Sequence, residues 1–199
     1  MVASNCTVFQ NSFLRMKSTT YSAFGWGKET FQPLTINDQT CEFDWVMRPG
    51  GSVPEHFHKE SDELFKVLEG EVTFRLNGKT IVKKAGEELF VPKMAVHGVA
   101  NKSKGDCKCR VSYQPAADQG KFFMVMMYLA DNGHTGEMAM LKAMHICDRL
   151  KYREFSSLQG GVKLMMDGTL GLFRLIAPLT GWDKLTRQYV QEVVKPAAG

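Results

Sequence analysis

Cysteine is scarce and irregularly placed in this chain of 199 residues. There are five cysteines, an odd number, and they are scattered from Cys6 to Cys147. A disulfide framework needs paired cysteines at regular intervals, so this pattern argues against one. Cys107 and Cys109 are two residues apart, which suits one face of a strand, but a zinc knuckle would need a second pair. We therefore predict small, buried thiols.

The sequence also lacks a long uninterrupted apolar stretch. The most apolar late segment, residues 162–179, contains Lys163, Asp167 and Arg174 and is therefore a poor transmembrane span. Residues 1–20 are polar and have no apolar segment typical of a secretion signal. These features predict a cytoplasmic protein, for which membrane contact is not expected.

Neither sign of charge dominates the chain. Lysine and arginine number 25 and aspartate and glutamate 21, so the net charge is only +4. The basic residues are scattered and form no stripe with interleaved aromatic residues, and we therefore expect no nucleic-acid partner. Hydrophobic residues make up 44% of the sequence, which is enough for a globular core without disulfides.

Short strands separated by turns are predicted between residues 31 and 117. Asn77-Gly78 is a strong signal for a two-residue hairpin turn, because both residues tolerate positive φ. Strands this short at regular spacing are typical of a barrel or a sandwich. The candidate strands are 41–47, 64–68, 72–76, 79–82, 88–91, 95–100 and 107–114.

The pattern changes after Pro115. Apolar residues recur at helical spacing over 137–150, and similar segments follow up to residue 194, separated by glycines and Pro178. We predict a C-terminal helical extension of three or four helices over residues 118–199, behind a barrel domain at 31–117. Residues 1–30 are predicted to be an N-terminal arm, either loose or forming a strand that pairs with a neighbouring subunit.

Histidine is rare as well, and this makes its placement informative. Three of the five histidines fall in two blocks. The first block is Gly50-x5-His56-x-His58-x4-Glu63-x6-Gly70, and the second is Gly86-x5-Pro92-x-Met94-x2-His97-x3-Asn101. His56 and His58 are two residues apart, so on a strand they point to the same face. Imidazole and carboxylate are ligands for first-row transition metals.

This double block resembles the two sequence motifs of the cupin superfamily over about residues 40–115. One position departs from the family spacing, since Met94 stands where the family has glycine. The resemblance implies a mainly β fold, a single cupin-like double-stranded β-helix (jelly-roll) barrel with a C-terminal helical extension. We also expect a homodimer that associates through sheet packing. The metal ligands implied by the resemblance are His56, His58, Glu63 and His97.

The ligand set predicts one divalent transition metal ion. Several inward-facing histidines and a carboxylate need partners once they are desolvated, and a metal supplies them. Three nitrogens and one carboxylate leave coordination positions open, as catalytic sites require. Ligand type does not choose among iron, manganese, nickel, copper, cobalt and zinc. Glu63 is also the candidate catalytic base, because it is the only anionic ligand.

Strand alternation predicts an apolar, aromatic pocket around this site, which favours an apolar or aromatic small-molecule ligand. The alternative is that the same side chains simply fill a small barrel. The candidate pocket residues are Trp45, Met47, Phe65, Phe74, Met94 and Tyr113.

Three functions fit these features. The first is an oxidoreductase of the dioxygenase type, in which the metal binds dioxygen or an enolisable aromatic substrate. The second keeps the metal but has non-redox isomerase, cyclase or lyase chemistry. The third is a non-enzymatic protein that binds or senses a small molecule.

Overall fold

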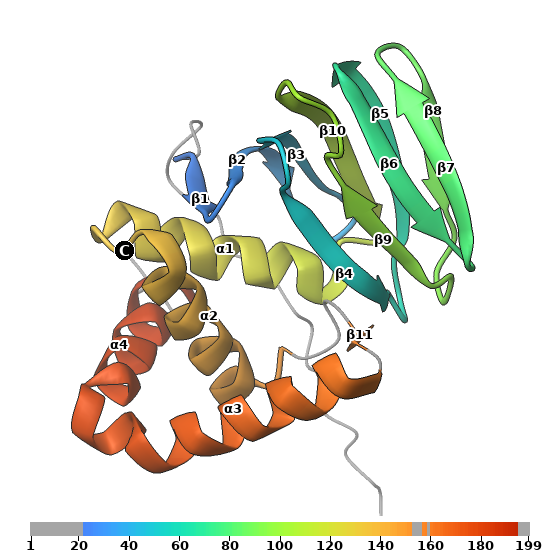
Figure 1. Ribbon diagram of the computed structural model, residues 1–199. Coiled ribbons are helices and arrows are strands. Elements are labelled where there is room, and N and C mark those ends of the chain that lie inside the picture. The colour runs from blue at the N-terminus through green and yellow to red at the C-terminus, as the bar shows by residue number, and fades with distance from the viewer. Residues whose placement is uncertain (1–21, 153–156, 159, 195–199) are drawn as a thin grey trace, which may run out of the picture.

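The computed structural model describes residues 22–152, 157–158 and 160–194. Within these ranges a strand-rich region comes first and helices follow it (Figure 1). The first strands are β1 (Phe24–Trp26), β2 (Glu29–Ile36), β3 (Cys41–Met47), β4 (Ser52–Phe57), β5 (Asp62–Glu69) and β6 (Glu71–Leu76). They are followed by β7 (Lys79–Lys84), β8 (Glu88–Val91), β9 (His97–Ala100) and β10 (Cys107–Gln114). The remaining elements are α1 (Ala117–Asp131), α2 (Gly136–Leu150), β11 (Ser157–Leu158), α3 (Gly160–Thr180), α4 (Trp182–Tyr189) and a π-helix at Val190–Val194.

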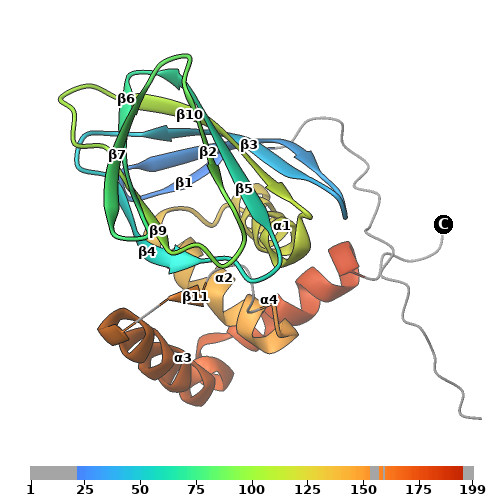
Figure 2. The same ribbon diagram turned by 90° about the vertical axis from the view of Figure 1, so that its right-hand side faces the viewer.

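The described strands form two antiparallel sheets that enclose a common interior (Figure 2). One sheet has the order β1-β2-β3-β10-β5-β8, and the other has the order β11-β4-β9-β6-β7. Strands β3 and β10 bury alternate residues, as β3 does at Cys41, Phe43, Trp45 and Met47, because successive side chains point to opposite faces. The predicted jelly-roll barrel with a C-terminal helical extension is confirmed.

The turn at Asn77-Gly78 joins β6 and β7 as predicted, and both residues have positive φ, 48° and 79°. The N-terminal region differs from its predicted boundary. β1 lies inside the predicted arm and pairs with β2 of the same chain, with Phe24 opposite Phe31. Residues 1–21 of that arm lie outside the described residues.

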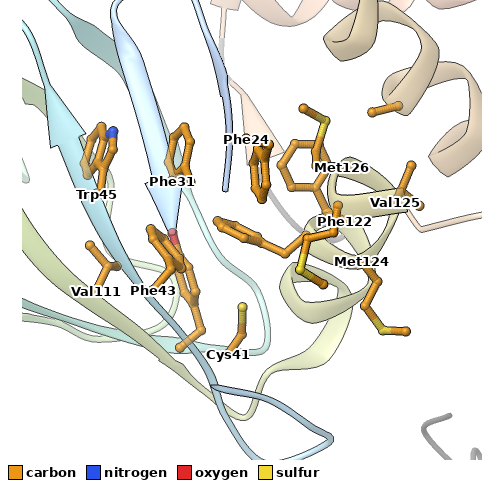
Figure 3. Packing of buried hydrophobic residues seen from close by; sticks show 14 of the residues in the cluster. Phe24, Phe31, Cys41, Phe43, Trp45, Val111, Phe122, Met124, Val125 and Met126 are labelled. Carbon is orange, nitrogen blue, oxygen red and sulfur yellow. The ribbon is translucent and has the colours of Figure 1, made fainter. Parts of the chain in front are cut away.

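Helix α1 joins the barrel to the other helices. It is buried over most of its surface, which explains why its segment Phe122–Leu129 is apolar on all sides rather than amphipathic. Its Phe123 packs against Phe43 of β3, with ring centroids 4.2 Å apart. In Figure 3 a row of aromatic rings runs from Trp45 through Phe31 and Phe24 towards this helix. The barrel and the helices therefore share one hydrophobic core.

Four of the five cysteines lie in described ranges, and all four are free and buried, as predicted: Cys41, Cys107, Cys109 and Cys147. The fifth, Cys6, lies outside the described residues. Across the same described ranges, the helices are either too short or too polar to span a bilayer.

Replacing Phe123 with alanine is expected to lower the free energy of unfolding by about 3–5 kcal/mol, because a buried ring is lost from the core shared by barrel and helices. Urea denaturation would measure this loss. Phe90→Ala is the matched control: that ring is 57% exposed, and its removal should change stability by no more than about 0.5 kcal/mol. Equal effects of the two substitutions would contradict a shared core.

Candidate metal centre

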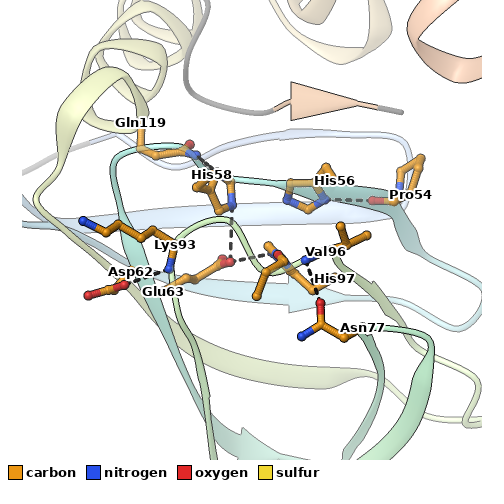
Figure 4. A network of polar contacts seen from close by, with 11 residues as sticks. Pro54, His56, His58, Asp62, Glu63, Asn77, Lys93, Val96, His97 and Gln119 are labelled. Carbon is orange, nitrogen blue, oxygen red and sulfur yellow. Dashed lines mark hydrogen bonds and ion pairs between the residues drawn. The ribbon is translucent and has the colours of Figure 1, made fainter. Parts of the chain in front are cut away.

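The four predicted ligand residues come together between the two sheets (Figure 4). His56 lies on β4 and His58 follows that strand directly, so both rings point to the interior. His97 begins the neighbouring strand β9, where it pairs directly with His56. Glu63 reaches the same point from β5 in the opposite sheet. All four side chains are buried.

The distances between these groups suit a single ion. The ligand nitrogens of His56, His58 and His97 all lie within 4.8 Å of one another. The Oε2 atom of Glu63 lies 2.8 Å from Nε2 of His97 and 3.4 Å from Nε2 of His58. The carboxylate therefore adjoins two of the three rings.

The orientation of each ring is set by its other nitrogen. Nδ1 of His56 donates to the carbonyl of Pro54 (2.8 Å), and Nδ1 of His97 donates to the carbonyl of Ala95 (3.0 Å). A carbonyl only accepts, so both rings carry their proton on Nδ1 and keep the lone pair of Nε2 for a ligand. Such partners fix the tautomer of metal-binding histidines.

His58 is held by the helical extension rather than by its own strand. The amide nitrogen of Gln119, on α1, lies 2.5 Å from Nδ1 of His58. Turning the amide over places its oxygen there, where it accepts a hydrogen bond from Nδ1 and leaves the lone pair of Nε2 for a ligand. Gln119 is itself buried, so the amide has a fixed position. Helix α1 therefore contributes directly to the geometry of the cluster.

Burial and mutual charge set the ionisation of the cluster. Burial, together with His97 and His58, lowers the pKa of His56 to about 4, which keeps this ring neutral. Burial opposes ionisation of Glu63, but His58 and His97 outweigh it and hold the pKa of Glu63 below its ordinary value. Burial likewise opposes protonation of His97, and the Glu63 carboxylate outweighs it and raises the pKa of that ring.

The donor set fits a metal ion. The contact between Glu63 Oε2 and His97 Nε2 is short but lacks the alignment of a hydrogen bond, so among the described residues both atoms have no hydrogen-bond partner. Buried polar atoms in this state cost free energy and call for an explanation. A divalent cation bound by the three imidazoles and the carboxylate would satisfy them.

Three members of the cluster, His56, His58 and Glu63, line a cavity of about 980 Å³ between the barrel and the helices, and His97 lies behind them. Of the six predicted pocket residues, Trp45, Phe65 and Tyr113 line this cavity. Met47 and Phe74 are buried in the barrel core and are not among the lining residues. The role of all these residues in binding a substrate stays a prediction.

Met94 lies away from the cavity. Its backbone has φ 68°, in the left-handed region, and its side chain is 58% exposed. The expectation that this side chain borders the pocket fails for that reason, since the left-handed turn directs it outwards. The backbone has a structural role instead, because the amide of Met94 donates to the carbonyl of His58 (2.8 Å) and so connects the two motifs.

Sequence reasoning missed three groups of cavity residues. No sequence signal singled out Gln119, because it lies in the polar first turn of α1 between Asp118 and Lys121. Glu29 was detectable because it shares the inward parity of Phe31 on β2. No sequence signal identified Met140 and Met144 of α2, which reach the cavity only through packing between segments distant in the chain.

Comparison with known proteins adds three findings on sequence. Residues 43–113 match the family model of the cupin domain. The chain is 35% identical over 68 residues to the tetracenomycin polyketide synthase protein TcmJ of Streptomyces glaucescens, covering 34% of this chain and 44% of that protein. It is 38% identical over 47 residues to the polyketide synthase CurC of Streptomyces cyaneus, covering 24% of this chain and 30% of that protein. The chain thus spans less than half the length of these relatives.

Solved structures that match part of this chain include the following two. KdgF from Halomonas sp. has a TM-score of 0.45 and 13% identity, covering 49% of this chain and 94% of that chain. An RmlC-like cupin from Shewanella frigidimarina has a TM-score of 0.46 and 22% identity, covering 50% of this chain and 87% of that chain.

Replacing Gln119 with alanine is expected to weaken the binding of Zn(II) by about 10–100-fold, because His58 loses the partner that orients its ring. Competition with a chromophoric chelator measures the affinity. Gln188→Ala, at an exposed position of α4, is the control and should bind Zn(II) as the wild type does. An unchanged affinity in the Gln119 variant would show that the amide does not support the site.

Replacing Met94 with glycine is expected to raise the free energy of unfolding by about 1 kcal/mol, since glycine adopts positive φ without steric cost. Met138→Gly is the matched contrast, because Met138 is similarly exposed but helical. That substitution should lower stability by about 1 kcal/mol. Urea denaturation compares the two, and the same sign for both would refute strain at Met94.

Proposed function

We propose that this chain, whose residues 43–113 form a cupin domain, is a metal-dependent enzyme for an aromatic or enolisable small molecule. The observation that carries the proposal is the convergence of three buried imidazoles and one carboxylate, of which His56, His58 and Glu63 line a large aromatic cavity. A purely structural cluster would not need to face a cavity.

Each ligand residue has a defined part in holding the ion. His56, His58 and His97 present Nε2, and Glu63 presents one carboxylate oxygen. A five- or six-coordinate ion held by this donor set would keep coordination positions open for other ligands. When bound, a divalent ion would supply Lewis acidity that stabilises negative charge on an enolate or phenolate oxygen. The identity of the ion is not specified by the donor types.

The rest of the cavity suits a planar apolar molecule. Aromatic side chains from strands and from helix α1 line it, among them Phe31, Phe43, Trp45, Phe122 and Phe123. Flat rings of this kind stack on aromatic ligands. Residues from α2 and α3 complete the lining, so the helical extension shields a bound molecule from water on that side.

Ring closure is the reaction class that we favour. Two relatives are named as polyketide synthase proteins, and this supports carbon–carbon bond formation without a change of oxidation state. In such a step a base takes a proton from a carbon beside one carbonyl, the resulting enolate carbon attacks a second carbonyl carbon of the same molecule, and the new alkoxide takes that proton back. The attacking carbon then loses its second proton and the neighbouring carbon loses the hydroxyl group, so that water leaves and a ring double bond forms. Glu63 is the candidate for that base, because it is the carboxylate of the cluster.

Oxygenation is the second candidate, because open positions beside the three imidazoles and Glu63 also suit dioxygen chemistry. A sensing role without turnover is the third. The homodimer, the cytoplasmic location and the lack of a nucleic-acid partner stay predictions.

Elemental analysis of untagged protein is expected to find close to one divalent transition metal per chain. The double variant His56→Ala/His58→Ala should lose it, since two of the three imidazoles are removed. His134→Ala, at a histidine outside the cavity lining, is the control and should keep its metal. A wild-type protein that holds no metal even after reconstitution would overturn the proposal.

Measurements of turnover distinguish ring closure, oxygenation and a sensing role. A synthetic aromatic triketone should be converted to a ring-closed phenol by Zn(II)-loaded protein without oxygen, as followed by absorbance. Consumption of dioxygen with an iron-loaded sample, and no anaerobic product, would favour oxygenation instead. Binding with helix rearrangement and no product in either case would indicate a sensor.

A further inference from the structure

A second polar group faces the same cavity, in a different part of the barrel. Glu29 of β2 lines the cavity, although its side chain is only 8% exposed. Its Oε2 atom has no hydrogen-bond partner within the described part of the chain. The neighbouring Lys28 does not neutralise it, because Nζ of Lys28 donates to the carbonyl of Pro49.

The strand registers place Glu29 far from the metal cluster. Glu63 lies opposite Tyr113, and Tyr113 lies opposite Cys41, so these residues form one inward-facing row. Glu29 lies in the row of Met47 and Cys107, three rows further along the same sheet. Alternate residues of a strand are about 7 Å apart, so the two rows are separated by about 20 Å along the strands.

Trp45 adds a hydrogen-bond donor beside this carboxyl. Its indole is buried and lines the cavity, and its Nε1 has no hydrogen-bond partner among the residues described. Trp45 pairs with Phe31, two residues from Glu29, so it occupies the adjacent row on the neighbouring strand (Figure 3). An indole N–H only donates and a carboxylate accepts. The two groups are complementary to a hydroxyl, which does both.

A buried carboxyl at Glu29 lowers the free energy of unfolding of the protein. Burial raises the pKa of Glu29 to about 7, so near neutral pH its carboxyl exists in both protonation states. The thiol of Cys107, two strands away in the same row, has its pKa raised to about 11, chiefly by burial, and offers no positive charge. A buried polar group without a compensating partner is costly, and such groups concentrate at functional sites.

We propose that Glu29 and Trp45 bind a hydroxyl group of the ligand at the end of the cavity remote from the metal cluster. The inference rests on the proposed function and makes its substrate more specific. The ligand is an elongated, multi-ring aromatic molecule that carries a metal-binding oxygen at one end and a phenolic or alcoholic hydroxyl at the other. The aromatic rows between Glu63 and Glu29 contact its rings.

Two anthraquinones test this anchor. Chrysophanol and emodin share a pair of hydroxyl groups flanking a carbonyl, which chelates divalent metals, and differ by one phenolic hydroxyl on an outer ring of emodin. Quenching of tryptophan fluorescence in Zn(II)-loaded protein reports their binding, since Trp26 and Trp45 line the cavity. We expect emodin to bind about tenfold more tightly than chrysophanol, the effect of a hydrogen bond to a charged group.

The variants distinguish an anchor from a structural residue. Glu29→Leu should abolish the preference for emodin and leave chrysophanol affinity within about twofold, because a single hydrogen bond is lost. Glu29→Gln keeps an acceptor and should retain part of the preference. Neither change should lower the melting temperature, since Oε2 of Glu29 bonds to no described protein group.

The binding and melting measurements distinguish failure of the hydroxyl anchor from failure of the proposed function. If wild type binds both anthraquinones equally, or if Glu29→Leu weakens both equally, the anchor is refuted while the proposed function stands. If wild type binds neither probe, the aromatic cavity itself is refuted, and the anchor with it. A lower melting temperature of both variants would assign Glu29 to the fold rather than to a ligand.

Discussion

The pairing of β4 with β9 is the constraint on which the candidate site depends. Only in the register that places His56 opposite His97 do both rings face the interior, because a slip of one residue would turn every side chain of a strand to the other face. Hydrogen bonds hold this register at both ends. The amide of Met94 donates to the carbonyl of His58, and the amides of Gly50 and Asn101 donate across the other end.

This constraint explains why the two motifs contain residues that touch no ligand. The side chain of Asn101 is buried and donates to the carbonyls of Met47 and Gly105. It therefore ties the end of β3 to the loop after β9, and with them the strands that carry the histidines. The helices add a comparable constraint, because Gln119 of α1 fixes the third ring. The candidate site therefore includes residues of both the barrel and the helical extension, although the two are separate segments of the sequence.

Much of the candidate site can be predicted from the sequence, using the two-residue period of strands and the spacing of the motif residues. Alternation on strands predicts that His56 and His58 share a face and that Trp45 and Phe65 point inwards. The rule does not apply at Met94, which lies in a turn between β8 and β9 and has a left-handed backbone conformation. It says nothing of Gln119, because the approach of α1 to β4 depends on aromatic packing between Phe123 and Phe43. Contacts between segments distant in sequence are set by packing, which no local pattern encodes.

The buried polar atoms without hydrogen-bond partners specify the substrate more closely than the metal cluster alone does. Among the described residues near the cavity, one set of buried atoms without a hydrogen-bond partner lies at Glu63 and His97, and another lies at Glu29 and Trp45, with aromatic rows between them. In a barrel built for stability alone, apolar residues at Glu29 and Trp45 would avoid the cost of desolvated polar atoms. The cavity lining is instead polar at its two ends and apolar between them. This order of groups fits a single molecule with a polar group at each end. The cost to the fold is recovered only when that molecule is present, because it then supplies the missing partners.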